Sequence, residues 1–114
     1  MIQQLLDMGI KDFRVLDALS QVPRHIFLDQ ALWSRAYENR ALTIGYKQTI
    51  SQPFIVARMT EHLLSHTSKR GKVLNHVLEI GSGCGTNQLY YLTLQMMFVQ
   101  LKESNLWLQN RVKI

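Results

Sequence analysis

The sequence has few of the features that mark secreted, membrane or repetitive proteins. Among its 114 residues there is one cysteine, Cys84, so the disulfide framework of a small secreted domain is excluded. No apolar run reaches the roughly 18 residues that a membrane-spanning helix needs. The N-terminus lacks the basic start and long apolar stretch of a signal peptide. Together these absences predict a cytoplasmic protein without a membrane segment.

The positive charge is moderate and spread along the chain. Thirteen Lys and Arg residues stand against eight Asp and Glu residues, which gives a formal net charge of +5. A nucleic-acid-binding protein usually gathers such charge on one surface. Here only Lys69, Arg70 and Lys72 cluster, and they are typical of a solvated turn. The charge pattern therefore argues against nucleic acid as a partner, and the 46% hydrophobic content predicts one globular domain.

The N-terminal region is expected to be mainly helical. Apolar residues near a 3.6-residue period predict two short helices separated by Gly9, with Asp12 as the cap of the second and Pro23 at its end. These apolar residues are Leu5, Leu6, Val15, Leu16 and Leu19. A further helical stretch is expected over 29–37, followed by an irregular run that ends at Gly45.

A third helix has the clearest start signal. Ser51 can accept hydrogen bonds from free backbone N–H groups, and Pro53 is tolerated in the first turn of a helix. The helix is expected to reach about Leu64. Its apolar stripe is predicted to consist of Ile55, Val56, Met59 and Leu63. A polar loop over 65–72 follows.

The most informative local feature is an apolar run that meets three glycines. The run over 77–80 is typical of a buried parallel strand, and Gly81, Gly83 and Gly85 follow it at alternate positions. Glycine permits a tight turn with positive φ and lets a ligand approach the backbone. A helix after the turn would add N–H groups and a dipole that favour a polar or anionic group. Dinucleotide-binding folds hold their ligands at this edge of the sheet.

The spacing of these glycines is GxGxG rather than GxGxxG. With Glu79 two residues before the first glycine, the pattern fits nucleoside-binding methyltransferases better than nicotinamide enzymes. An ordinary glycine-rich turn between a strand and a helix is the alternative for this motif by itself.

A second set of short motifs precedes the glycines at characteristic distances. They are Val22-Pro23-Arg24, Phe27, Ala36-Tyr37, Ala41-Leu42, Ile44-Gly45, Gln48-Thr49-Ile50-Ser51-Gln52-Pro53 and Val56-Ala57-Arg58-Met59. In order and spacing they resemble the protein-L-isoaspartate O-methyltransferase family over roughly residues 3–85. The Thr-Ile-Ser-Gln-Pro block is highly specific to that family, whereas many methyltransferases share the glycine motif.

The resemblance implies the N-terminal part of an α/β, Rossmann-like methyltransferase fold that uses S-adenosylmethionine. The substrate would be the free carboxylate of isoaspartyl residues in damaged proteins, and methylation would begin their repair. Ser51 takes the position of the family's active-site serine. The implied cofactor-binding residues are Gln48, Thr49 and Ile50, in a loop, and Glu79, Gly81, Ser82 and Gly83 in the glycine motif. The resemblance implies no metal.

The implied chemistry agrees with these residue types. A carboxylate is already ionised at neutral pH, so methyl transfer needs no strong base. Positioning and electrostatics should carry most of the catalysis. A serine hydroxyl and loop N–H groups can hold one carboxylate oxygen while the other attacks. For Ser51 a plain helix-capping role is the alternative, and both roles can hold at once.

The resemblance is expected to end at Gly85. The chain is interpreted as a single truncated domain with a helical region and active-site loop over 1–75, a first strand and glycine motif over 76–86, and a divergent tail over 87–114. The run 87–101 fits either a core helix or a pair of strands. The acidic residue with which the family's second strand binds the cofactor ribose is not found there.

The genetic code offers one explanation for the divergent tail. Read from the junction of Gln95 and Met96 in a shifted frame, the codons can spell the family's second-strand signature. We therefore hypothesise a frameshift, which the coding sequence would test. With an incomplete sheet, the chain is expected to bind cofactor weakly or not at all, to be impaired or inactive, and to be marginally stable. The intact family fold is expected to be a monomer, whereas this fragment can self-associate.

Several other interpretations stay open. The chain can be a non-catalytic helical interaction module or a relic of the family. A nicotinamide-binding fragment would use an acidic residue about 20 positions past the glycines, such as Glu103. His62 and His66 have a zinc-compatible spacing without a third ligand. Trp33 and Tyr37 are expected in the core.

Overall fold

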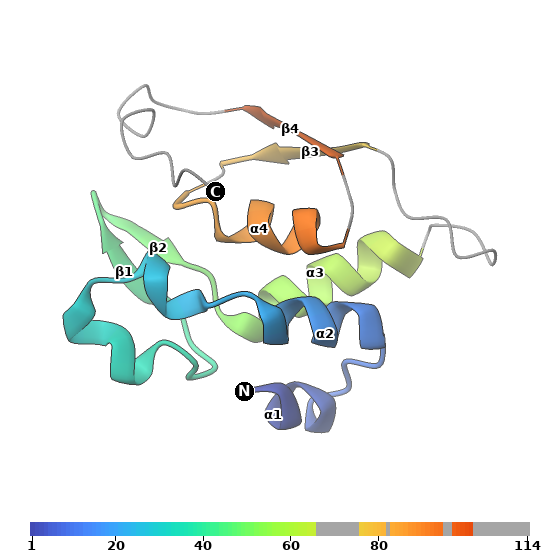
Figure 1. Cartoon of the computed structure of the whole chain (residues 1–114), viewed down its shortest axis with the longest axis horizontal. Coiled ribbons are helices and arrows are strands. Elements are labelled where there is room, and N and C mark those ends of the chain that lie inside the picture. The colour runs from blue at the N-terminus through green and yellow to red at the C-terminus, as the bar shows by residue number, and fades with distance from the viewer. Residues whose placement is uncertain (66–75, 82, 95–96, 102–114) are drawn as a thin grey trace.

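The computed structural model describes residues 1–65, 76–81, 83–94 and 97–101, the last of these by their backbone alone. Three helices, α1, α2 and α3, form one side of the molecule (Figure 1). A fourth helix, α4, lies between them and a two-stranded parallel sheet of β3 and β4 (Figure 1). A separate hairpin of β1 and β2 stands at one end. The structure is therefore a mixed helix and strand fold with a small sheet.

The first two helices confirm the helical start of the chain. Helix α1 spans Ile2–Asp7 and α2 spans Phe13–Gln21. Gly9 lies between them with φ +97°, a backbone conformation that glycine adopts without strain. The Asp12 side chain accepts a hydrogen bond from the backbone N–H of Arg14 at 2.9 Å, as predicted for the cap of α2.

The main hydrophobic core lies where these helices meet α3 and α4. Its buried residues are Leu5, Ile10, Val15, Leu16, Leu19, Val22, Val56, Ala57, Leu64, Val77, Tyr90 and Tyr91. Because α2 supplies three of them and contacts both α3 and α4, it is the central helix of the domain. This packing orients α4 and, through it, the turn that precedes it.

Helix α3 spans Pro53–Ser65 and begins where the sequence predicts, but its cap and its buried stripe differ from the prediction. The N–H of Val56 donates to the carbonyl of Gln52, and the side-chain oxygen of Asn39 accepts from the N–H of Phe54 at 3.0 Å. Asn39, not Ser51, therefore caps the helix. The buried residues are Pro53, Val56, Ala57, Thr60 and Leu64, whereas Ile55 and Met59 are exposed. Small Ala57 and Thr60 pack inward because α3 lies against α2.

The segment between the second and third helices is less helical than expected. Two 3-10 helices span Arg24–Phe27 and Gln30–Arg35, and the second confirms in shorter form the helical stretch over 29–37. Trp33 and Tyr37 are about half exposed, at 45% and 41%, so the prediction that they lie in the core is wrong. The ring of His25 contacts both of them at the surface instead.

A β-hairpin replaces the predicted irregular run and loop. Strand β1, Leu42–Gly45, pairs antiparallel with β2, Gln48–Ile50. The two residues between them, Tyr46 and Lys47, have φ of 52° and 56°. Positive φ at both central positions is the geometry of a tight hairpin turn whose twist matches that of the strands. The predicted loop at 48–50 is therefore a strand.

The C-terminal described part forms a β-α-β unit. Strand β3 spans His76–Ile80, α4 spans Thr86–Thr93 and β4 spans Met97–Leu101. The strands are parallel, with His76 opposite Met97 and Ile80 opposite Leu101. The strand at 76–80 is confirmed, and the run after Gly85 resolves into a helix and then a second strand. The division of the chain into regions over 1–75, 76–86 and 87–114, with the last as a divergent tail, stays a prediction. Residues 102–114, including Glu103, lie outside the described residues.

Strand β3 buries one face against α4 and leaves the other uncovered by described residues. Val77 is buried, whereas Leu78 and Ile80 are 60% and 71% exposed.

No helix within the described ranges is long and apolar enough to span a membrane.

Candidate active site

The turn after β3 has the backbone that its glycines predict. Gly81, Gly83 and Gly85 have φ of 78°, 52° and 89°, a region that L side chains rarely adopt. A Cβ atom built on Gly81 or Gly83 would meet no atom of the described residues within 4 Å. The backbone of the turn therefore faces open space, and a ligand can approach it closely. Ser82 lies outside the described residues.

The start of α4 is tied to the end of β3. Gly85 caps the helix, and its carbonyl accepts from the N–H of Leu89 at 3.3 Å. The Gln88 amide donates to Oε2 of Glu79 at 3.3 Å. A Cβ on Gly85 would lie 3.1 Å from Oε1 of Gln88, so a larger residue at this position would require the Gln88 side chain to shift slightly. Glu79 is half-buried at the carboxyl end of β3, two residues before the first glycine of the turn.

Strand β2 and the residue after it divide into buried and accessible groups. Gln48 and Thr49 are exposed, whereas Ile50 is buried with 3% of its surface exposed. Only the backbone of Ile50 can therefore serve a ligand. Ser51 is exposed, and its hydroxyl has no hydrogen bond to any described residue. Because Asn39 caps α3, this hydroxyl is not engaged in capping the helix.

One contact brings the two predicted motifs together. Cys84, in the glycine turn, packs against the buried cluster of Leu28, Ala36, Leu42 and Ile50. The hairpin and the carboxyl end of β3 lie at the same end of the molecule (Figure 1). The thiol of Cys84 is also 2.9 Å from the hydroxyl of Thr86, the first residue of α4. A single apolar cluster thus joins the strand before Ser51 to the turn that holds the glycines.

Arg24 is a component of this region to which the sequence assigns no role. It is completely buried, and its Nε donates to the carbonyl of Ala36 at 2.7 Å. Burial lowers the pKa of its guanidinium, an effect that the neighbouring hydroxyl of Tyr90 and thiol of Cys84 oppose. Arg24 belongs to the Val-Pro-Arg motif that carries part of the family resemblance. That position in a motif is the only signal that points to it.

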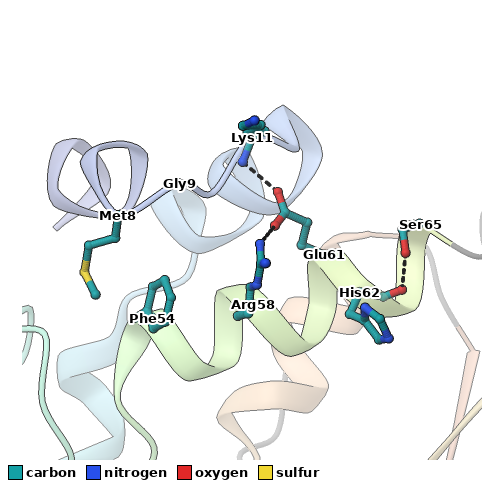
Figure 2. A pocket seen from close by; sticks show the side chains of 8 residues that line it. All are labelled: Met8, Gly9, Lys11, Phe54, Arg58, Glu61, His62 and Ser65. Atoms are coloured by element: carbon teal, nitrogen blue, oxygen red, sulfur yellow. Dashed lines mark hydrogen bonds and ion pairs between the residues drawn. The ribbon is translucent and has the colours of Figure 1, made fainter.

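A pocket lies on another part of the surface, between α3 and the segment that joins α1 to α2 (Figure 2). It has a volume of about 530 Å³ and is lined by Met8, Gly9, Lys11, Phe54, Arg58, Glu61, His62 and Ser65. None of these is a predicted catalytic or cofactor-binding residue. The described residues contain no group of three His, Cys, Asp or Glu side chains that could hold a metal, and His66 lies outside them. The pocket is therefore separate from the candidate site.

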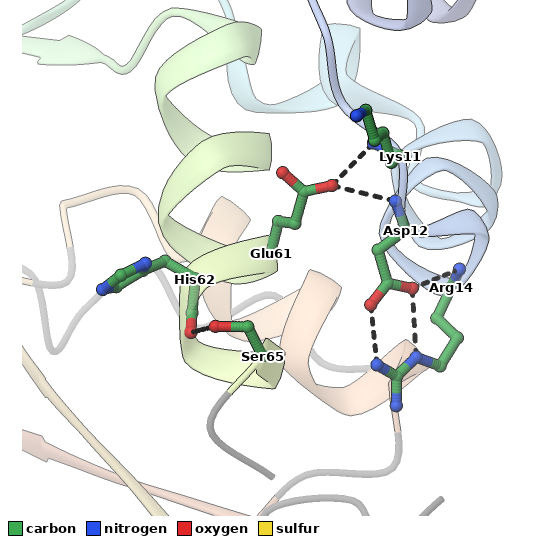
Figure 3. Close-up of polar contacts among 6 residues, drawn as sticks. All are labelled: Lys11, Asp12, Arg14, Glu61, His62 and Ser65. Atoms are coloured by element: carbon green, nitrogen blue, oxygen red, sulfur yellow. Dashed lines mark hydrogen bonds and ion pairs between the residues drawn. The ribbon is translucent and has the colours of Figure 1, made fainter. Parts of the chain in front are cut away.

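Glu61 explains the polar wall of this pocket (Figures 2 and 3). Its Oε1 accepts from the backbone N–H groups of Lys11 at 2.6 Å and Asp12 at 2.9 Å, and its Oε2 accepts from Arg58 at 3.0 Å. Burial raises the pKa of Glu61, but these donors outweigh it and the pKa lies below the ordinary value for glutamate. Glu61 thus ties the start of α2 to α3.

Replacing Glu61 with glutamine is expected to remove part of the acid sensitivity of the fold. A lowered pKa in the folded state means that the carboxylate stabilises the fold above the ordinary glutamate pKa, and that this stabilisation is lost as the pH falls through the lower folded value. We expect Glu61→Gln to cost about 1–2 kcal/mol near pH 7 and much less near pH 3. Urea unfolding at both pH values measures this. An equal cost at both would contradict the role of the charge.

A family model and individual relatives match this chain, and both kinds of comparison give the same family. The family model described as Protein-L-isoaspartate(D-aspartate) O-methyltransferase matches residues 1–103. A protein-L-isoaspartate O-methyltransferase of Methylobacillus flagellatus is 59% identical over 85 residues, and one of Cellvibrio japonicus is 56% identical over the same length. Each match covers 75% of this chain and 36% of the relative. The chain thus matches about a third of the length of these relatives.

The family match also corrects the expected end of the resemblance. The match to the family model extends to residue 103, beyond Gly85, and the matched residues therefore include α4 and β4. The frameshift stays a prediction that the coding sequence tests.

Proposed function

Because the chain belongs to the protein-L-isoaspartate(D-aspartate) O-methyltransferase family, we propose that it carries the cofactor turn and acceptor segment of an S-adenosylmethionine-dependent enzyme. The substrate class is proteins and peptides with an isoaspartyl carboxylate. The observation that carries this proposal is the packing of Cys84 in the glycine turn against the cluster that contains Ile50. That contact unites the two motifs that this chemistry requires.

The fold supports the proposal at the level of its β-α-β unit. Parallel strands joined by a helix, with a glycine turn at the carboxyl end of the first strand, are the unit from which Rossmann-like sheets are built. We therefore assign β3, α4 and β4 to the first such unit. The single cysteine, unpaired and half-buried, fits a reducing compartment, and we place the activity in the cytoplasm.

The glycine turn fits a nucleoside cofactor. Open space beside Gly81 and Gly83 leaves room for a ligand against the backbone. We assign the binding of S-adenosylmethionine to Gln48, Thr49, Glu79, Gly81, Ser82, Gly83 and the backbone of Ile50. When bound, this cofactor supplies an electrophilic methyl group to which a carboxylate oxygen can bond directly.

Ser51 is assigned the acceptor side of the reaction. Its exposed hydroxyl, without a partner among the described residues, can donate a hydrogen bond to one oxygen of the isoaspartyl carboxylate. The second oxygen is then held toward the methyl group. No proton has to be removed from the substrate at neutral pH, so orientation supplies the rate enhancement.

A pair of peptides tests the proposed function. One contains an isoaspartyl residue, its twin contains aspartate at that position, and transfer of radiolabelled methyl groups is measured for both. We expect labelling of the isoaspartyl peptide alone, at a lower rate than with the Methylobacillus flagellatus relative assayed in parallel. Equal labelling of both peptides, or none above the blank, would favour the non-catalytic interaction module.

A further inference from the structure

Asn39 makes three hydrogen bonds, two of them to the segment that follows Ser51. Its side-chain oxygen accepts from the backbone N–H of Phe54 at 3.0 Å, and its backbone carbonyl accepts from the side-chain amide of Gln52 at 3.1 Å. Its side-chain NH2 group donates to the sulfur of Met8 at 3.1 Å. The first two bonds hold the chain on the α3 side of Ser51.

The other side of Ser51 is fixed by strand pairing and burial. Ile50 precedes Ser51, is paired with Leu42 of β1 and has only 3% of its surface exposed. Ser51 therefore lies between a buried strand end and a segment bonded to Asn39. Because the Ser51 hydroxyl has no hydrogen-bond partner among the described residues, its direction is determined by the backbone that carries it.

The loop that carries Asn39 is itself anchored to the interior of the domain. Arg24 is completely buried, and it donates from Nε to the carbonyl of Ala36 at 2.7 Å and from Nη2 to the carbonyl of Arg40 at 3.4 Å. These two carbonyls lie on either side of Asn39 in the sequence. Ala36 is buried in the same apolar cluster as Ile50. The loop can therefore serve as a fixed support for the segment of Ser51.

We propose that Asn39 is a positioning residue that holds the Ser51 hydroxyl in the direction of the isoaspartyl carboxylate. This inference rests on the proposed function, which assigns Ser51 to the acceptor side of the reaction. The cap of α3 then affects the rate of methyl transfer as well as the stability of the helix. Aspartate at position 39 should also serve, because Asn and Asp are about equally good acceptors at a helix N-terminus and the helix dipole favours a carboxylate there.

Three variants separate positioning from stability. Asn39→Ala removes the oxygen that accepts from Phe54, whereas Asn39→Asp keeps an oxygen at that place. Asp12→Ala is the matched control, because the Asp12 side chain caps a different helix, α2, by accepting from the N–H of Arg14 at 2.9 Å. Each variant of the 114-residue chain is assayed for methyl transfer to the isoaspartyl peptide and for unfolding in urea.

We expect Asn39→Ala to lower kcat about tenfold and to change the KM for S-adenosylmethionine less than about twofold, because the glycine turn is unaltered. Asn39→Asp should keep kcat within about twofold of wild type. Asp12→Ala should lose about as much stability toward urea as Asn39→Ala and keep the wild-type kcat. An equal fall in kcat for Asp12→Ala would overturn the proposal, because loss of stability would then explain both results.

The dependence on Ser51 gives a second test. If Asn39 acts through the Ser51 hydroxyl, adding Asn39→Ala to Ser51→Ala should lower kcat by less than about a further twofold. A further loss as large as that of Asn39→Ala alone would contradict action through Ser51.

Backbone motion tests the positioning without any activity. NMR relaxation of the backbone amides should give wild-type order parameters near about 0.85 at Ser51 and Phe54, and values that fall toward about 0.6 in Asn39→Ala. Asn39→Asp and Asp12→Ala should match wild type. An unchanged order parameter at Ser51 in Asn39→Ala would overturn the proposal. If wild type transfers no methyl group to the isoaspartyl peptide, the proposed function fails, while the relaxation data still decide whether Asn39 positions Ser51.

Discussion

Replacing Ser51 with alanine is expected to slow methyl transfer to an isoaspartyl peptide by about tenfold to a hundredfold, because one carboxylate oxygen loses its hydrogen-bond donor. The free energy of unfolding should hardly change. The Ser51 hydroxyl bonds to no described residue, and Asn39 caps α3 in its place. Initial rates with radiolabelled methyl donor, together with urea unfolding of both proteins, measure the two effects.

Ser34→Ala is the matched control for this experiment. Ser34 is also exposed and makes no hydrogen bond to a described residue, but it lies in the 3-10 helix over Gln30–Arg35, outside the predicted site residues. It should change neither rate nor stability. If Ser51→Ala instead loses about 1 kcal/mol of stability while the rate is unchanged, Ser51 has a helix-capping role and the proposed role in catalysis is contradicted.

The second large effect is expected at Gly81. Gly81→Ala should weaken binding of S-adenosylhomocysteine by more than about tenfold, because a Cβ atom would occupy the space beside the turn and strain its backbone. The φ of +78° should also cost about 1–2 kcal/mol of stability. Ligand titration and urea unfolding separate the two losses.

Gly9→Ala is the matched control, because it introduces the same backbone strain at a glycine outside the proposed ligand site. Gly9 has φ +97°, and a Cβ there would likewise lie more than 4 Å from every atom in the described part of the chain, but the residue lies between α1 and α2. We expect a comparable loss of stability and unchanged ligand binding. If both variants lose affinity to the same degree, the loss at Gly81 reflects unfolding and the assignment of the turn is wrong.

The parts of the fold that sequence patterns predict are those with strong local signals. Asp12 caps α2, Pro53 begins α3 and the three glycines adopt positive φ, because each depends on the conformational preference of one residue type. The hairpin escaped prediction because its turn residues, Tyr46 and Lys47, are not the Asn-Gly pair that such turns favour. The family motifs nevertheless pointed to its second strand.

The site was harder to predict than its components. Ser51 and the glycines could be named from motifs. The cap of α3 could not, because Asn39 is 15 residues before Phe54, the residue whose backbone N–H it accepts from. The packing of Cys84 against the cluster of Ile50 is likewise a tertiary contact without a periodic signature. Arg24 appeared only as part of a motif, since burial of a charged residue runs against its usual preference.

The central claim is that the glycine turn and the segment at Ser51 form one ligand-binding site. Titration of the isotopically labelled chain with S-adenosylhomocysteine, followed by NMR, tests it at each residue. We predict weak binding, on the order of 0.1 mM or weaker, with chemical-shift changes at Gly81, Gly83 and Gly85 and over 48–51. Changes centred on the pocket around Phe54, or at the glycines without the hairpin, would contradict a shared site.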